Sequence, residues 1–182
     1  MTAFFSMLSF PALLTCSNLV LPRERDTVLC PKNVAILAEN YARAYAASPT
    51  RYHWGGQDFI DKKNPARTLS IDCSGLVVNC YFYAAKEAGY ELLFNDAAVA
   101  DFYRKYAMPI KNPRAGDIVF MGSLRGTPTH MGIFIKREGG RVWFIDATLN
   151  LEENINGVTY RSWSETDPRI NSFGRLMLKH PY

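Results

Sequence analysis

Residues 71–80 read IDCSGLVVNC and place two of the chain's four cysteines seven residues apart. Asp72 is a good N-cap residue, because its carboxylate can accept hydrogen bonds from the free N–H groups of a first helical turn. The run that follows is apolar on nearly every face before Lys86 and stops at Gly89. This pattern predicts a helix that begins at Cys73 and is buried in the middle of a domain.

The two cysteines of this stretch differ in their expected surroundings. Cys73 lies in the first turn, at the positive end of the helix macrodipole, which favours the nucleophilic thiolate. Cys80 lies two turns deeper in an apolar helix, where a small packing role is expected. Two turns separate the thiols by about 10 Å, too far for a disulfide, so we expect both to stay reduced.

Length and composition limit the possible classes of protein. The chain has 182 residues, of which 48% are hydrophobic and 21% charged, enough for one domain with its own core. Its net charge of +4 comes from scattered lysines and arginines, without a basic run. A nucleic-acid partner is therefore not expected.

The N-terminal segment, residues 1–31, is predicted to be a leader followed by a linker, with the folded domain at 32–182. The leader has no charged side chain before Arg23, and its apolar run is shorter than the roughly 20 residues of a membrane-spanning helix. Residues 13–16, LLTC, resemble a bacterial lipoprotein cleavage box, in which Cys16 would be acylated. The alternative is a frayed apolar terminus with Cys16 buried, because no Lys or Arg follows Met1.

The remaining chain changes from helical to strand-like patterns. Apolar spacing predicts an amphipathic helix over 32–47 and a second helical stretch over 95–106. Strands are expected at DIVFMG, HMGIFIK, VWFIDAT, VTYRSW and FGRLMLK, with a hairpin turn at 138–140. Helices first and strands afterwards indicate an α+β domain with an antiparallel sheet.

A thiol nucleophile needs a base, and histidine is the usual one because its pKa lies near neutrality. The chain has three histidines. His180 is two residues from the C-terminus, and His53 lies between aromatic residues before a glycine turn. His130 begins a strand after a loop rich in Gly, Pro and Thr, a position typical of catalytic groups.

Asp146 is the candidate for a third polar group. It follows four apolar residues in the strand VWFIDAT, and a carboxylate in a buried strand must be paired or hydrogen-bonded. Asp146 is 16 residues from His130, across the predicted hairpin turn. The two side chains are therefore expected to be near neighbours on adjacent strands.

The sequence resembles the NlpC family of papain-like bacterial cell-wall peptidases. Five elements carry the resemblance in the family's order, namely YHWGG at 52–56, DCSGLV at 72–77, GDIVF at 116–120, THMGIF at 129–134 and FIDA at 144–147. The resemblance implies a papain-like fold, in which the nucleophile begins a central helix that packs on an antiparallel sheet. It also implies hydrolysis of peptide bonds in peptidoglycan stems, typically between D-glutamate, linked through its side-chain carboxyl, and a diamino acid.

The resemblance assigns roles to individual residues. Cys73 would be the nucleophile, His130 the general base and Asp146 the third polar group. Substrate contacts would come from Tyr52, Trp54, Asp72 and Ser74. No metal or cofactor is required, the partner would be peptidoglycan or a muropeptide, and the location would be the cell envelope or the outside of the cell.

Two departures from the family pattern stand out. The third position is commonly His, whereas Asp146 here makes a Cys-His-Asp set, and a carboxylate would stabilise an imidazolium at least as well. The segment between Gly56 and Asp72 is longer than usual. Its charged residues could border the substrate groove, and they are Asp58, Asp61, Lys62, Lys63 and Arg67.

Three alternatives remain open at this point. One is another papain-like amidase or acyltransferase that uses the same Cys and His on a different amide. The second is a non-catalytic module that binds cell-wall peptides, against which the intact Cys73, His130 and Asp146 argue. The third is a metal site formed by these three residues, which no paired Cys or His spacing supports.

Overall fold

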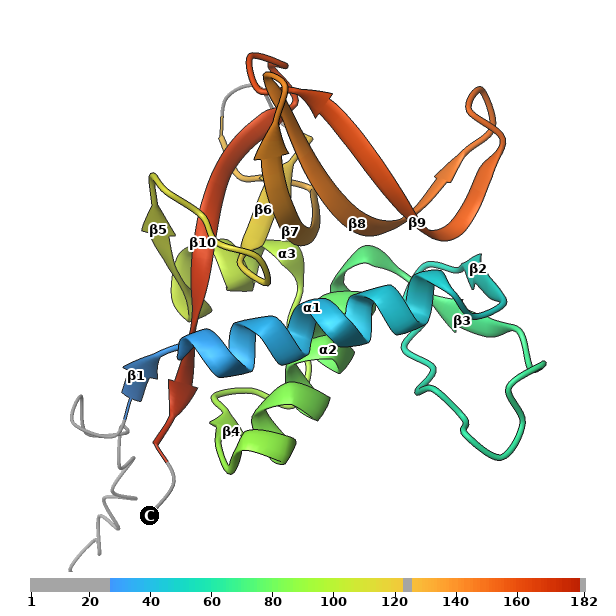
Figure 1. Cartoon of the computed structure of the whole chain (residues 1–182), viewed down its shortest axis with the longest axis horizontal. Coiled ribbons are helices and arrows are strands. Elements are labelled where there is room, and N and C mark those ends of the chain that lie inside the picture. Colours follow the sequence, from blue (N-terminus) through green and yellow to red (C-terminus); the bar gives the residue numbers. More distant parts are fainter. Residues whose placement is uncertain (1–26, 123–125, 181–182) are drawn as a thin grey trace, which may run out of the picture.

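The computed structural model describes residues 27–122 and 126–180, which form a curved antiparallel sheet with two long helices against it (Figure 1). The helical segments are α1 (Lys32–Ala46), α2 (Cys73–Ala88), α3 (Val99–Asp101) and the π-helical η2 (Phe102–Tyr106). The strands are β1 (Thr27–Leu29), β2 (Thr50–Tyr52), β3 (Leu69–Ile71), β4 (Glu91–Leu92), β5 (Ala107–Ile110), β6 (Ile118–Met121), β7 (His130–Glu138), β8 (Arg141–Asn150), β9 (Ile155–Ser164) and β10 (Ile170–Lys179).

The sheet is ordered β1-β10-β6-β7-β8-β9, and β4 and β5 also pair with β10. All of these pairs are antiparallel, and β6 to β9 follow one another as hairpins. The turn between β7 and β8 is made by Gly139 and Gly140, as the sequence predicted. The last strand, β10, pairs with β6 on one side and with β1 on the other. The first and last strands of the described chain are therefore neighbours in the sheet.

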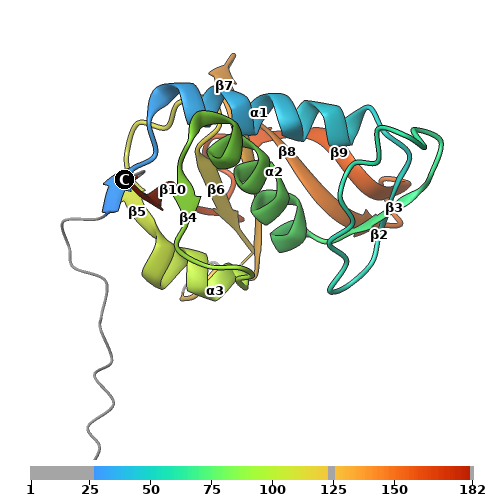
Figure 2. The ribbon, with the colours of Figure 1, turned by 90° about the horizontal axis from the view of Figure 1, so that it is seen from below.

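The two long helices lie on one side of the sheet, as the two views in Figures 1 and 2 show. Strand residues alternate between two apolar clusters, as the pleat of a strand requires. Ile118 and Phe120 belong to the main core, which also contains α1 and α2, whereas Val119 and Met121 belong to a smaller cluster with Phe144. The predicted α+β, papain-like architecture is confirmed, with α2 as the central helix.

Several elements differ from the sequence-based expectations. The expected helical stretch at 95–106 was wrong at its start, because Ala98 has an extended backbone and helical structure begins only at Val99. The Asp96 carboxylate accepts a hydrogen bond from the N–H of Ala97, an arrangement that competes with a helical turn. The short strands β2, β3, β4 and β5 were not predicted.

The chain segment before α1 also takes part in the sheet. Thr27–Leu29 lie inside the range in which composition predicted a linker, yet they pair with Met177–Lys179 of β10. Residues 1–26, with Cys16, lie outside the described residues. The division into a leader of residues 1–31 and a domain of residues 32–182 stays a prediction. No helix within 27–122 or 126–180 is long and apolar enough to cross a membrane.

Candidate active site

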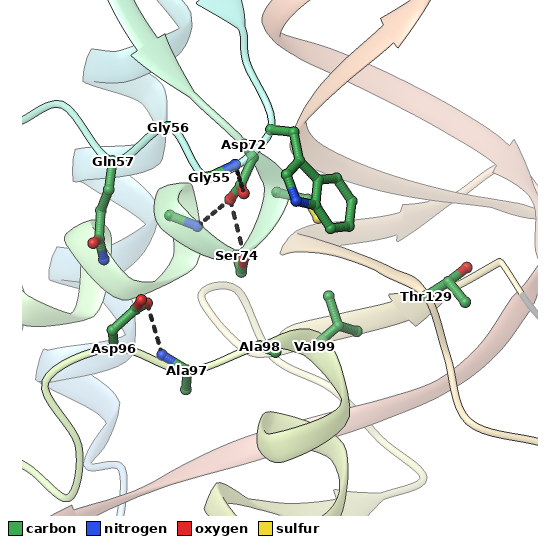
Figure 3. A pocket seen from close by; sticks show the side chains of 13 residues that line it. Gly55, Gly56, Gln57, Asp72, Ser74, Asp96, Ala97, Ala98, Val99 and Thr129 are labelled. Atoms are coloured by element: carbon green, nitrogen blue, oxygen red, sulfur yellow. Dashed lines mark hydrogen bonds between the residues drawn. The ribbon is translucent and has the colours of Figure 1, made fainter.

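Asp72 holds the start of α2 against the turn that precedes it. Its Oδ1 accepts hydrogen bonds from the Gly75 N–H at 2.7 Å and the Ser74 hydroxyl at 2.9 Å. Its Oδ2 accepts one from the Gly55 N–H at 2.8 Å, and these bonds are the dashed lines around Asp72 in Figure 3. Asp72 is therefore the predicted N-cap, and both of its carboxylate oxygens accept hydrogen bonds.

Gly75 allows the helix and the turn to approach each other closely. A Cβ atom at this position would lie 2.3 Å from the carbonyl oxygen of Gly56, closer than any side chain permits. The same carbonyl accepts the N–H of Asp72 at 2.9 Å. The glycines of the motifs WGG and DCSG thus fix where the Cys73 thiol lies.

His130, the first residue of β7, is held by Asp146 of β8. The His130 Nε2 and the Asp146 Oδ2 are 2.6 Å apart, and the Asp146 side chain is fully buried. Gly132 makes room for this contact, since a Cβ there would lie 3.0 Å from the Cβ of Asp146. The predicted proximity of these two residues across the hairpin is confirmed.

Because Nε2 of His130 is bonded to Asp146, the other ring nitrogen, Nδ1, is the one available to the Cys73 thiol. Burial lowers the pKa of the His130 imidazole, but hydrogen bonds to Asp146 and Cys73 and the charges of both groups raise it more, to about 9. The raised pKa favours the imidazolium form of His130.

Sequence reasoning missed Arg161, on β9. Its Nη1 donates to the same Asp146 Oδ2 at 3.0 Å, and only 7% of its side chain is exposed. The sequence offered one signal, which is that Arg161 lies within the predicted strand VTYRSW. Its partner, Asp146, lies in a different predicted strand. Without the register of β8 and β9, that acid and this arginine could not be matched.

A pocket of about 210 Å³ opens beside Cys73 (Figure 3). One wall is the turn at Trp54 to Gln57 together with the start of α2, and the opposite wall is the loop from Asp96 to Val99, with Thr129 at one end. Trp54 is 81% exposed at the rim. The five charged residues of the long segment between Gly56 and Asp72 do not line this pocket, contrary to the expectation that they could border the groove.

Tyr52, at the end of β2, lies close to the thiol. Burial, followed by the charges of Cys73 and Asp72, raises the pKa of its hydroxyl. Its backbone N–H donates to the Oδ1 of Asn156 at 2.9 Å, which fixes β2 against the start of β9. The structure thus brings Tyr52, Trp54, Asp72 and Ser74 around Cys73, as expected from the sequence.

Among the described residues, Cys30, Cys80, His53 and His180 do not line the pocket. Burial raises the pKa of Cys80 far above its ordinary value, and that of Cys30 to about 12. Cys30, Cys73 and Cys80 are free thiols, as expected for the pair in α2. His53 is exposed, and His180 packs against the ring of Tyr90 instead.

Metal ligation was the third alternative for Cys73, His130 and Asp146. Within residues 27–122 and 126–180, no group of three or more His, Cys, Asp or Glu side chains has an arrangement that could hold a metal ion. The geometry instead joins the histidine to a carboxylate on one side and to a thiol on the other.

A thiol at the start of a central helix, facing a carboxylate-bound histidine on an antiparallel sheet, defines the papain-like class of proteins. The family model described as "NlpC/P60 family" matches residues 49–170, more than half of the chain. The chain therefore belongs to the NlpC/P60 family, and the resemblance seen in the sequence is confirmed.

Comparisons with individual proteins add less. No curated protein matches the chain. Nine chains of solved structures match, among them the crystal structure of Ly7917, with a TM-score of 0.45, and that of Ly7917 with the hydrolyzing product of MDP, with a TM-score of 0.48. Each is 16% identical and covers 81% of this chain, whereas the match spans only 62% of Ly7917.

Proposed function

We propose that this protein is a cysteine peptidase that hydrolyses amide bonds in peptidoglycan stem peptides. The proposed bond joins D-glutamate, through its side-chain carboxyl, to a diamino acid. Membership of the NlpC/P60 family supports the substrate class. The observation that carries the chemistry is His130 between the buried carboxylate of Asp146 and the thiol of Cys73, at the wall of an open pocket.

The proposed reaction starts from a Cys73 thiolate and a His130 imidazolium, the pair that forms when the thiol proton passes to the ring. The thiolate attacks the carbonyl carbon of the scissile amide, and N–H groups at the start of α2 stabilise the oxyanion. The C–N bond then breaks, and the imidazolium gives its proton to the leaving amine. Water then attacks the thioester while His130 accepts its proton, and the C–S bond breaks, which releases the acid and restores the Cys73 thiolate and the His130 imidazolium.

Asp146 orients the imidazole and stabilises the imidazolium in this proposal. Because Nε2 is bonded to the carboxylate, Nδ1 points toward the thiol in the tautomer that the reaction needs. Substrate contacts are assigned to Tyr52, Trp54 and Ser74. Asp72 lines the pocket and holds its turn through three hydrogen bonds, and a substrate contact is assigned to it as well.

The test is incubation of the purified protein with muropeptides, followed by mass spectrometry of the fragments. We expect masses that place the cut within the stem peptide. C73A should abolish release, whereas C80A, the matched control from the same helix, should retain it. A cut between the glycan and L-Ala would favour an amidase, and no release by the folded protein would favour a binding module.

We further propose that the protein acts in the cell envelope or outside the cell. This location follows from the proposed substrate. The mass of the mature N-terminus, measured in the native host, would distinguish a lipidated Cys16 from simple secretion. An unprocessed N-terminus that starts at Met1 would contradict both.

A further inference from the structure

Arg161 is a buried cation next to the candidate active site. Arginine is almost never fully buried unless it is paired. Its guanidinium lies over the rings of Trp163 and Phe144, at 5.0 and 5.9 Å from their centroids, and donates to Asp146. Within 27–122 and 126–180, the second acid paired with it is Glu153, whose carboxylate oxygen is 3.5 Å from Nη2 and whose side chain is 48% exposed. Asp146 is thus the main counter-charge of Arg161.

His130, Asp146 and Arg161 lie on three neighbouring strands, β7, β8 and β9. Asp146 is opposite Thr159 in the register of β8 and β9, so Arg161 is its diagonal neighbour on the same face. Both His130 and Arg161 bond to the same oxygen, Oδ2. A change in the charge of either partner therefore acts directly on the bond of the other.

The charges of the set are balanced when Arg161 is included. With a thiolate at Cys73 and an imidazolium at His130, the carboxylate and the guanidinium bring the sum to zero. Without Arg161 the same set carries one net negative charge. A site with a net negative charge binds protons more tightly, so His130 would release its proton less readily.

We propose that Arg161 is a positioning residue that holds Asp146 in place and limits how tightly His130 keeps its proton. This proposal rests on the proposed function, in which His130 donates a proton to the leaving amine. Arg161 touches neither the thiol nor the substrate pocket. Its hydrogen bond holds Asp146, and its positive charge lowers the proton affinity of the whole set.

Other ionisable groups near the set belong to different elements. Tyr52 of β2 and Asp72 before α2 lie on the thiol side, where the charges of Cys73 and Asp72 act on the Tyr52 hydroxyl. Glu153, in the turn between β8 and β9, faces Arg161 from the outside. An exposed acid at that distance contributes little, so it cannot replace Asp146 as the partner of Arg161.

The test is a pH titration of the His130 ring by NMR, which requires no substrate. The chain has only three histidines, and an H130Q variant assigns the signal. We expect a midpoint near 9 in the wild type and one about 1 pH unit higher in R161Q, the size expected for loss of a nearby charge. R161K keeps the charge and should stay near the wild-type midpoint, whereas D146N should titrate lower.

The matched control is R141Q, which removes one positive charge from an exposed position on β8. It should leave the midpoint unchanged. If R161Q does not fold because Asp146 is left without a counter-charge, D146N/R161Q is compared with D146N, and the same upward shift is expected. An unchanged midpoint in the folded R161Q or in this second pair would overturn the proposal.

Activity against muropeptides separates this proposal from the proposed function. The alkaline limb of kcat/KM should move upward in R161Q by the same amount as the NMR midpoint. A purely structural Arg161 would lower the rate at every pH without moving the limb. If the midpoint moves but no muropeptide is cleaved by the wild type, the positioning role stands and the proposed function fails.

Discussion

Two buried aspartates of the described chain, Asp117 and Asp146, are each paired with an arginine from a neighbouring strand, and they differ in how their oxygens are used. Asp117 lies directly before β6. Its carboxylate accepts hydrogen bonds from Nε and Nη2 of Arg175, at 2.9 and 2.8 Å, and its Oδ2 also accepts one from the backbone N–H of Arg114. At Asp146 one oxygen accepts both Arg161 and His130, while Oδ1 has no hydrogen-bond partner among the described residues.

This difference separates a structural ion pair from a chemical one. The bidentate clamp on Asp117 holds β6 and β10 together and contains no group that titrates near neutrality. The carboxylate of Asp146 is shared with the imidazole of His130, whose pKa is raised to about 9. Both pairs are equally buried on the aspartate side, so burial alone does not identify the functional one.

The largest effect is expected from D146N. An asparagine keeps the shape but removes the charge that stabilises the imidazolium, so kcat/KM should fall by about 10³ to 10⁴. Steady-state cleavage of muropeptides, measured well below the unfolding temperature, checks this. Activity within tenfold of the wild type would mean that Asp146 is a structural partner of Arg161 only.

The next effect is expected from D117N, the matched variant of the other pair. It leaves Arg175 without its counter-charge, so the free energy of unfolding should fall by about 3 to 5 kcal/mol. The folded fraction should cleave at nearly the wild-type rate. Urea unfolding and initial rates on the same samples measure both quantities. A large loss of kcat/KM in the folded D117N protein would mean that Asp117 also takes part in catalysis.

A smaller effect is the pH dependence of stability. The pKa of His130 is raised from 6.5 to about 9 in the folded protein, so its contribution to stability is complete below pH 6.5 and is lost as the pH rises through 9. Urea unfolding at pH 6 and pH 9.5 should show this loss in the wild type and in D117N. D146N should lose much less stability between pH 6 and pH 9.5. An equal loss of stability in D146N would mean that a group other than the His130–Asp146 pair causes the pH dependence.

The smallest effect is expected from E153Q. Its carboxylate is half exposed and 3.5 Å from Arg161, so the free energy of unfolding should change by less than about 1 kcal/mol. The His130 midpoint should stay within a few tenths of the wild-type value. A shift as large as that expected for R161Q would show that Arg161 depends on Glu153 as much as on Asp146.

The sequence by itself determined the parts of the site that rest on local chemistry. Asp72 followed by Cys73 predicts a capped helix start because N-capping depends on neighbouring residues only, and the structure has that cap. The turn at 138–140 predicted that His130 and Asp146 would meet, since a hairpin sets which residues face each other. The short strands β2 to β5 escaped prediction because each is held by a partner outside its own segment. β2 and β3 pair with each other, and β4 and β5 pair with β10.

Only the tertiary structure decided which buried acid has which partner. Asp117 and Asp146 both look like single acids next to apolar strand residues, and neither sequence position says which arginine will reach it. That choice depends on the order of strands, with β10 beside β6 and β9 beside β8, and on their register. Arg161 could therefore be recognised as a partner of Asp146 only after the long-range pairing of strands was known.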